Sequence, residues 1–180
     1  MTNEIKKYVC VSMQSTAQMK YWNYPNGWKI LVSYLNDKGF DVYVIDKLTS
    51  FGGQKMNYLP ANAIDKTGLD IEDTIELIGN CEFFIGTSSG LSWVAWALKK
   101  HVVMISGFTH PTFEFTTNCT RIFNPNVCNS CFNDVKVEFE KGDWMACPYH
   151  KDTIRQFECT KTITPKMVIE QIEKNYLYPT

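Results

Sequence analysis

Four of the seven cysteines in this 180-residue sequence lie in one segment near its carboxyl end. Cys128 and Cys131 form a C-x2-C pair, Cys147 follows after fifteen residues, and Cys159 after eleven more. A C-x2-C pair brings two thiolates within reach of one metal ion, and two further cysteines complete a tetrahedron. The spacing predicts a structural metal site, with zinc as the default metal and iron also suited to four sulfur ligands.

Alternatives to this ligand set stay open. His150 lies three residues beyond Cys147 and could replace one thiolate, although Cys159 already supplies a fourth sulfur. Four incidental thiols are the purely structural alternative. A redox role is weaker, because redox pairs usually open a helix after a strand, and this pair precedes a charged, strand-like run. The other cysteines, which fall in or beside predicted strands, are expected in the core; they are Cys10, Cys81 and Cys119.

A second group of residues has the chemistry of an anion site. In "GTSSGLSWVAWALKK" a strand runs into Gly86, three hydroxyl residues and Gly90, and a helix follows. Small residues let the backbone approach a ligand, and the free N–H groups of a first helical turn favour an anion. Ser88 and Ser89 can donate further hydrogen bonds. The structural alternative is a capping serine followed by a glycine that eases a tight turn.

A third stretch supports the anion interpretation. Ser15, Thr16 and Lys20 follow the first predicted strand, so they are expected at the same rim of the sheet as Ser88 and Ser89. A lysine among hydroxyls beside a helix N-terminus is a credible diphosphate site, and a solvated surface lysine is the alternative. The sequence contains neither a Walker motif nor G-x-G-x-x-G, so neither a P-loop NTPase nor a usual dinucleotide fold is indicated.

The elements that must position these residues alternate between strand and helix. Apolar runs predict strands over 8–13, 41–46, 81–86 and 101–106. Helical spacing of Trp28, Leu31, Val32 and Leu35 predicts a helix over 25–38, with Gly39 as its stop. Asp70 is expected to cap a helix to Asn80, and further helices are predicted over 91–100 and 164–176. Residues 47–69 are expected to form a long irregular connection.

This alternation predicts an α/β fold, with a parallel sheet covered by helices on both faces. Ligands of such sheets bind beyond the carboxyl ends of the strands, where both polar loops are expected. We expect one domain over 1–125 and 161–180, and a small four-cysteine metal finger over 126–160.

Composition narrows the class of protein. The net charge of −1 does not favour nucleic acid or an anionic membrane as a partner. No apolar run approaches the ~20 residues needed to span a bilayer, and the amino-terminal residues lead into a strand without the features of a signal peptide. These features predict a cytoplasmic protein with reduced thiols, and an odd cysteine count suits a disulfide framework poorly.

The combined motifs resemble a known family. "GTSSGLSWVAWALKKHVVMISGFTHPTFEF", "CNSCFNDVKVEFE", "CPYHK", "RQFECT" and the earlier "STAQMKYWNYPNGW" are similar to the carboxyl-terminal half of bacterial autotransporter heptosyltransferases, relatives of the lipopolysaccharide ADP-heptose transferases. The resemblance covers nearly the whole chain. It implies a GT-B glycosyltransferase, of which this chain is the Rossmann-like half that holds the nucleotide sugar, here ADP-heptose.

The resemblance also implies site residues and partners. Cys128, Cys131, Cys147 and Cys159 would bind a ferric ion, with zinc as the alternative. The diphosphate would be met by residues of both loops, namely Ser15, Thr16, Lys20, Thr87, Ser88, Ser89, Gly90 and Ser92. Asp46 at the end of the second strand is a weaker candidate for a ribose contact. The acceptor would be a serine hydroxyl of an autotransporter adhesin, and the partner an amino-terminal transferase half or further copies of the chain.

The implied reaction is an inverting attack on the anomeric carbon with loss of ADP, which needs a base near the acceptor. The catalytic residue stays unknown, because the family's base lies in the amino-terminal half, where the acceptor binds. His110 and Glu114 are expected on the donor side, near the sugar hydroxyls or simply as satisfied loop residues. The alternative function is an inactive nucleotide-sugar-binding or assembly module.

Overall fold

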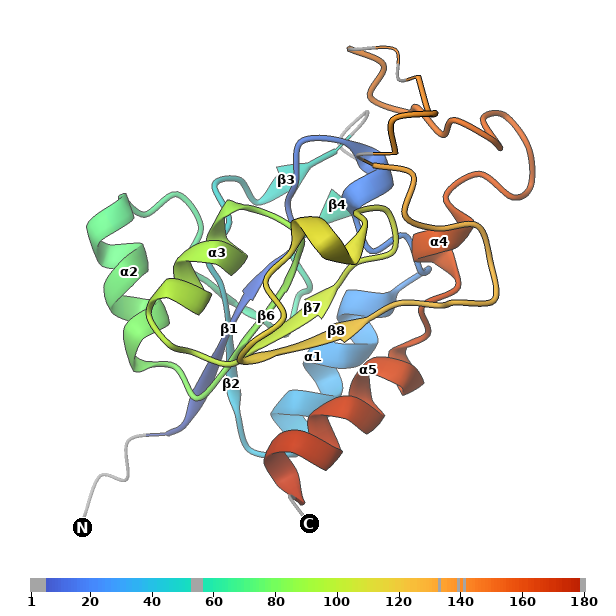
Figure 1. Ribbon diagram of the computed structural model, residues 1–180. Coiled ribbons are helices and arrows are strands. Elements are labelled where there is room, and N and C mark those ends of the chain that lie inside the picture. The colour runs from blue at the N-terminus through green and yellow to red at the C-terminus, as the bar shows by residue number, and fades with distance from the viewer. Residues whose placement is uncertain (1–5, 53–56, 133, 139, 141, 179–180) are drawn as a thin grey trace, which may run out of the picture.

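In the computed structural model, a six-stranded parallel sheet forms the centre of the protein (Figure 1). The structure describes residues 6–52, 57–132, 134–138, 140 and 142–178, so the predicted lead-in at 1–5 lies outside it. The sheet has the order β5-β2-β1-β6-β7-β8. Its strands are β1 (Tyr8–Ser12), β2 (Asp41–Val44), β5 (Ile64–Asp65), β6 (Phe84–Thr87), β7 (Val102–Ile105) and β8 (Cys119–Ile122).

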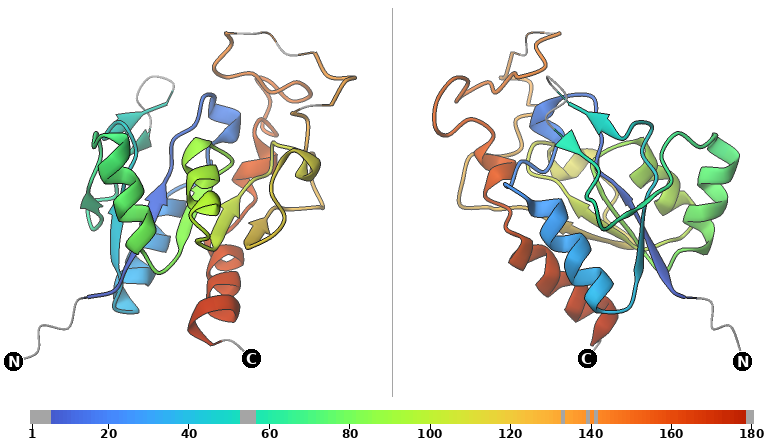
Figure 2. Two further views of the ribbon diagram at one scale, coloured as in Figure 1. Left: turned by 60° about the vertical axis from the view of Figure 1, so that its left-hand side comes forward. Right: turned by 180° about the vertical axis from the view of Figure 1, so that it is seen from behind.

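Helices cover both faces of the sheet (Figure 2). One face packs against α1 (Gly27–Asp37) and α5 (Pro165–Ile172), which continues into a π-helical turn over Glu173–Leu177. The other face packs against α2 (Ile71–Asn80) and α3 (Gly90–Ala97). Alternate residues of β1 enter the two core clusters. This architecture confirms the predicted α/β fold.

The predicted helix boundaries rest on local signals that the structure reproduces. After α1, Gly39 has φ +89° and its N–H donates to Asn36 O, while the N–H of Phe40 donates to Leu35 O. These two bonds form a Schellman motif, which explains why the helix ends at a glycine. Asp70 caps α2 by accepting a hydrogen bond from Asp73 N at 2.9 Å.

Several elements were not predicted. The connection over 47–69 contains a short antiparallel pair, β3 (Ser50–Phe51) with β4 (Asn57–Tyr58), and then β5 at the sheet edge. β8 escaped prediction because it is a short edge strand whose residues are mostly only partly buried. A short helix, α4 (Glu158–Lys161), closes the cysteine segment. The charged run after Cys131 forms turns rather than a strand in its described residues.

The direction in which the chain winds across the sheet reverses between β1 and β6. β1 continues through α1 to β2 on one side, whereas β6 continues through α3 to β7 on the other. The two strands pair in parallel, with Ser12 opposite Gly86. In open α/β sheets, ligands bind where the chain turns in opposite directions from neighbouring strands. The loops after β1 and β6 therefore lie at the expected ligand-binding edge. None of the helices in the described part of the chain has the length and apolarity to cross a bilayer.

Candidate functional site

The turn between β6 and α3 is held by two of its own hydroxyls. Ser92 Oγ donates to Thr87 O at 2.6 Å, and Thr87 Oγ1 donates to Gln14 O, in the loop after β1, at 3.4 Å. Both residues are fully buried. Thr87 and Ser92 therefore shape the turn and tie it to the β1 loop, and their direct contact with a diphosphate stays a prediction.

The start of α3 keeps hydrogen-bonding capacity for a ligand. Ser89 is the N-cap residue, in an extended conformation, and its side chain caps no backbone N–H. Ser89 Oγ is buried and has no hydrogen-bond partner among the described atoms. Gly90 is exposed, and a Cβ there would meet open space. Because a buried hydroxyl without a partner is costly, this turn has the chemistry of an anion site together with its first-turn N–H groups and Ser88.

Lys20 ends a 3-10 turn, η1 (Gln18–Lys20), in the loop after β1. Its Nζ lies 4.5 Å from the centroid of the Phe132 ring, and burial lowers its pKa while the Glu114 carboxylate opposes this shift. Lys20 and Thr16 line a pocket of about 230 Å³. Ser15 does not line it, and its carbonyl accepts a hydrogen bond from Tyr21 Oη at 3.0 Å. The structure thus places Lys20 and Thr16, but not Ser15, on one cavity.

Asp46 follows β2 and is almost completely buried. Its carboxylate accepts hydrogen bonds from Ser12 Oγ at 2.7 Å, Met13 N at 2.7 Å and Gln14 N at 3.2 Å. Burial raises the pKa of Asp46 to about 6, and the three hydrogen bonds partly oppose that rise. Asp46 also lines a separate hollow of about 500 Å³ beside the start of α3. Its clear role is to fix the β1 loop, and the predicted ribose contact stays a prediction.

The four cysteines of the finger line one hollow of about 10 Å³. Cys128 Sγ and Cys131 Sγ are 3.9 Å apart. Burial raises the pKa of Cys131 and of Cys159 to about 12, and the neighbouring thiols add to the rise. The four cysteines line this small hollow, but among the described residues no three of their Sγ atoms lie within 4.8 Å of one another, so the four-thiol metal site stays a prediction. The other three cysteines lie in or against the sheet core, as predicted.

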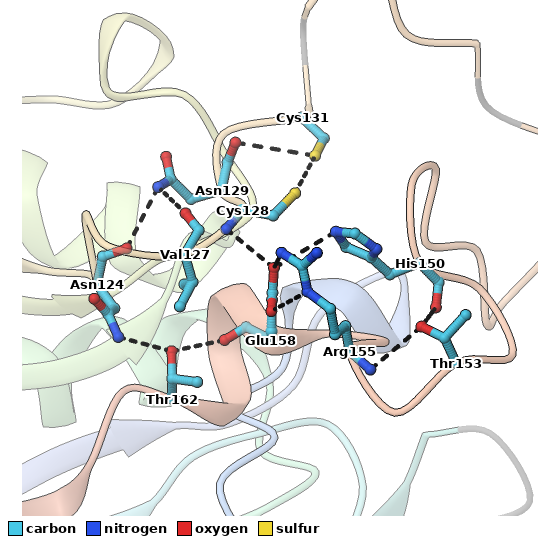
Figure 3. Close-up of polar contacts among 10 residues, drawn as sticks. All are labelled: Asn124, Val127, Cys128, Asn129, Cys131, His150, Thr153, Arg155, Glu158 and Thr162. Carbon is cyan, nitrogen blue, oxygen red and sulfur yellow. Dashed lines mark hydrogen bonds and ion pairs between the residues drawn. The ribbon is translucent and has the colours of Figure 1, made fainter.

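Polar side chains surround the hollow (Figure 3). Glu158 accepts two hydrogen bonds from the Arg155 guanidinium, at 2.9 and 2.6 Å, and one from Cys128 N at 3.1 Å. His150 Nε2 lies 3.5 Å from Glu158 Oε1. Cys128, His150 and Glu158 could themselves hold a cation, since their donor atoms lie within 4.8 Å of one another. The ion pair with Arg155 already balances the charge of Glu158, and the Glu158 carboxylate also holds the Cys128 backbone. The geometry therefore keeps His150 open as a ligand beside Cys128.

The finger is attached to the sheet at its ligand-binding edge. Ser130 N donates to Gly107 O at 2.9 Å, and Phe132 N donates to Phe108 O at 3.0 Å. A Cβ on Gly107 would lie 2.0 Å from Cys159 O, so glycine is required where the loop after β7 meets α4. Figure 1 shows the finger, in orange, at the upper right, above α4.

His110 and Glu114 are both satisfied within the protein. His110 Nδ1 accepts a hydrogen bond from Thr112 N at 3.2 Å and caps a short 3-10 turn. Glu114 Oε2 pairs with Arg121 Nε at 2.6 Å, and Ser106 Oγ also donates to Glu114. The buried Glu114 carboxylate therefore serves to hold the loop after β7 against β8, which is the structural one of its two expected roles.

The sequence did not predict that residues of the finger line the pocket beside Lys20. Asp143 and Trp144 line this pocket together with Phe132, although they follow Lys20 by more than a hundred residues. The residue types carry no local signal, because an aspartate and a tryptophan in an irregular segment are equally typical of a turn and of a packing contact.

Comparison with known proteins agrees with this architecture. Residues 2–141 match the family model of "Glycosyltransferase family 9 (heptosyltransferase)". The chain is 45% identical over 175 residues to the autotransporter heptosyltransferase Aah of Escherichia coli, an alignment that covers 96% of this chain and 44% of Aah. It is 35% identical over 169 residues to the inactive autotransporter heptosyltransferase BimC of Burkholderia thailandensis, over 93% of this chain and 38% of BimC.

A solved structure of a similar protein has the same fold. The iron-containing dodecameric glycosyltransferase TibC of enterotoxigenic E. coli superposes with a TM-score of 0.91 at 42% identity, over 97% of this chain and 46% of TibC. A second TibC structure, described as a complex with ADP-D-β-D-heptose, gives a TM-score of 0.89. The chain thus spans less than half the length of the relatives it matches. With its parallel sheet, hydroxyl-rich turn and family match over most of its length, the chain belongs to glycosyltransferase family 9, the heptosyltransferase family.

Proposed function

We propose that this chain is the donor-binding part of a heptosyltransferase that uses ADP-heptose and glycosylates serine hydroxyls of an autotransporter protein. The observation that carries the proposal is the unpartnered Ser89 hydroxyl at the start of α3, which follows a strand adjacent to the one that leads to Lys20. The similar TibC is described in complex with ADP-heptose, and the similar Aah is named an autotransporter heptosyltransferase.

In the proposed site, the diphosphate lies between the α3 N-terminus and Lys20. Ser88, Ser89 and the N–H of Gly90 donate to phosphate oxygens, and the Lys20 ammonium balances their charge. In the transfer step, a serine hydroxyl forms a bond to the anomeric carbon on the face opposite the leaving group. The bond from that carbon to the diphosphate breaks, ADP leaves, and the configuration inverts. Lys20 and the helix N-terminus then stabilise the charge that develops on the departing diphosphate.

The transfer also needs a base for the serine proton, and we assign none of the described residues to it. His110 and Glu114 have other partners. We propose that the base comes from a part of the enzyme outside this chain, either an amino-terminal transferase half or another copy of the chain. TibC, described as dodecameric, makes homo-oligomerisation a reasonable expectation. We place the reaction in the cytoplasm.

We further propose that Cys128, Cys131, Cys147 and Cys159 bind ferric iron, with zinc as the alternative. The position of all four cysteines around one hollow supports a metal, and the description of TibC as iron-containing supports iron. The metal would act as a cross-link that holds the irregular finger together, because metal binding energy contributes to folding. Elemental analysis gives the stoichiometry, and an electron paramagnetic resonance signal of high-spin ferric iron distinguishes iron from zinc.

A thermal melt with and without ADP tests donor binding. A ligand that binds the native state stabilises it by about 2.7 kcal/mol at a concentration 100 times its Kd. ADP should therefore raise the melting temperature by several degrees, whereas GDP at the same concentration should raise it less. An unchanged melt at saturating ADP would contradict the proposal.

An inactive binding or assembly module is the second candidate. The similar BimC is named inactive, so the family contains proteins without turnover. The two candidates share ADP-heptose binding and differ in transfer to an acceptor. Release of ADP in the presence of an acceptor and an amino-terminal transferase half would favour the enzyme, and tight binding without release would favour the module.

A further inference from the structure

The pocket beside Lys20 has two chemically different ends. The loop after β1 supplies Thr16 and the Lys20 ammonium, whereas the finger supplies Glu140, Asp143 and Trp144. Its volume of about 230 Å³ is below the roughly 300–1,000 Å³ of pockets for drug-sized ligands. The pocket therefore suits one small moiety rather than a whole nucleotide.

The finger end of this pocket is held in place by contacts to the loop that carries Lys20. Gln18 N donates to Trp144 O at 3.2 Å, and Trp144 Nε1 donates to Gln18 Oε1 at 3.3 Å. The Trp144 ring also meets the edge of Tyr21, with centroids 5.8 Å apart. These contacts fix the distance between the two ends of the pocket without any ligand.

Asp143 is held as an oriented carboxylate. Its Oδ2 lies 2.6 Å from Lys151 Nζ, and its Oδ1 accepts a hydrogen bond from Met145 N at 3.0 Å. These partners lower the pKa of Asp143, so the group is an anion at neutral pH. An ionised carboxylate only accepts hydrogen bonds, and it has about four lone-pair sites, of which the two contacts use two.

The charges decide which part of the donor lies at each end. A diphosphate at the finger end would face the Glu140 carboxylate and an Asp143 carboxylate that Lys151 already pairs, whereas at the Lys20 end it meets an ammonium. A neutral polyol has the opposite preference, because its hydroxyls donate to carboxylates and its C–H face can pack on an aromatic ring. With the anionic group on the Lys20 side, the pocket thus suits the neutral polyol that follows this group in a nucleoside diphosphate sugar.

We propose that the finger forms the sugar subsite of the donor pocket, with Asp143 accepting hydrogen bonds from sugar hydroxyls beside the ring of Trp144. This inference rests on the proposed donor function and gives the finger a role in substrate recognition. Met19 and Phe108 line both this pocket and the thiol hollow, so a single wall separates the sugar subsite from the four cysteines. The metal site would thereby also secure the sugar subsite.

Calorimetric titration of the purified chain with ADP and with ADP-heptose tests the inference. Asp143→Asn should weaken ADP-heptose binding on the order of 10-fold, since it removes a charge-assisted hydrogen bond. It should leave ADP binding within about two-fold or tighten it slightly, because a carboxylate near the diphosphate is lost. A contact with the sugar predicts that the affinity for ADP-heptose falls while the affinity for ADP does not.

Two control variants separate recognition from structure. Asp134→Asn alters a second finger aspartate whose Oδ1 accepts from Lys136 N at 2.9 Å, in the same turn geometry as Asp143, but which does not line the pocket. Lys151→Gln breaks the ion pair and keeps the Asp143 carboxylate. Asp134→Asn should bind ADP-heptose within about two-fold of the unaltered chain. Lys151→Gln removes a group that orients Asp143 but keeps its carboxylate, so it should weaken ADP-heptose binding less than Asp143→Asn does.

Each other outcome has a definite meaning. Equal weakening of ADP and ADP-heptose by Asp143→Asn, or the same loss in Asp134→Asn, would overturn the sugar subsite and leave the donor function intact. Unaltered ADP-heptose binding in Asp143→Asn would also overturn it. If the unaltered chain binds neither ligand, the proposed donor function fails first, and the subsite fails with it.

Discussion

The ligand-binding edge of the sheet and the cysteine finger position their side chains by different means. At the sheet edge, parallel strands with fully buried residues set where the loops after β1 and β6 begin. In the finger, the described residues between β8 and α4 form no helix or strand. They are held by turns and by contacts to the loops after β1 and β7, and the four cysteines among them line one hollow.

This difference shows where each region can fail. A backbone ladder shares its free energy among many hydrogen bonds and a continuous core, so the loss of one loop side chain leaves the edge folded. The described residues of the finger contribute to a small buried cluster, which includes Cys131, Phe157 and Cys159. We therefore expect changes in the finger to affect local folding and changes at the edge to affect ligand binding.

Loss of a thiol should produce the largest effect. Cys131→Ser should abolish stoichiometric metal binding and open the finger, because structural metal sites contribute on the order of 10 kcal/mol. Metal content and limited proteolysis within 126–160 measure this change. Cys119→Ser, on β8 outside the hollow, is the matched control and should keep its metal. A Cys131→Ser protein that retains metal and resists protease would contradict the expected dependence on the hollow.

The pH dependence of Asp46 should be the next largest effect. Burial raises its pKa from 3.8 to about 6, so the folded protein binds a proton that the unfolded chain releases between these values. The stability from this group is complete below pH 3.8 and is lost as pH rises through about 6, on the order of 3 kcal/mol. Urea unfolding at several pH values between 3.8 and about 6 measures how the free energy of unfolding changes with pH.

Asp46→Asn is the comparison for that slope. The amide cannot titrate, so the free energy of unfolding of the variant should fall less with rising pH. Its absolute stability should also be lower, because an amide nitrogen cannot accept a hydrogen bond, and one of the donors Ser12 Oγ, Met13 N and Gln14 N would lose its acceptor. If the free energy of unfolding changes equally with pH in the unaltered protein and in Asp46→Asn, the pKa of Asp46 is not elevated.

Removal of the Lys20 charge should act on ligand binding with little change in folding. Lys20→Met should weaken ADP binding on the order of 10- to 100-fold, the cost of one charge-assisted hydrogen bond. Its melting temperature without ligand should stay nearly unchanged, because the half-buried side chain lies in a loop outside the sheet. Lys166→Met, on the surface of α5, is the control and should bind ADP normally. Equal loss in both variants would point to non-specific electrostatics.

Arg155→Gln should give the smallest effect. It removes two hydrogen bonds to Glu158, the carboxylate that supports Cys128 N, and leaves all four thiols in place. Outer partners of metal ligands typically change affinity about 10-fold, and Arg155 is more than half exposed, which reduces its contribution further. Metal release into a chelator should be faster, with ADP affinity unchanged. If the variant releases metal at the same rate as the unaltered protein, Glu158 does not support the metal site.

Much of the fold could be predicted because its signals are local. The spacing of Leu31, Val32 and Leu35, the stop at Gly39 and the cap at Asp70 all act within one or two helical turns. β8 and β5 could not be predicted in this way, since short edge strands acquire their structure from the neighbour with which they pair.

The site residues also fall into two groups, those with a local signal in the sequence and those without one. The cysteine spacing predicted a metal site, and the hydroxyl-rich turn predicted an anion site. The structure lines one hollow with the four cysteines and makes Ser89 the N-cap of α3, while both binding functions stay predictions. The internal partners of Glu114 and Asp46 were not predictable, because Arg121 and the β1 loop reach them only through the packing of separate strands.

By itself the sequence determined the α/β alternation, the four metal-ligand candidates and the two loops that carry hydroxyls and a lysine. These features depend on periodicity and spacing, which are properties of neighbouring residues. Only the tertiary structure decided that the finger lies against the Lys20 loop and that Asp143 and Trp144 complete its pocket. The physical reason is that Gln18 and Trp144 meet through a hydrogen bond across 126 residues of chain, a contact that no local pattern records.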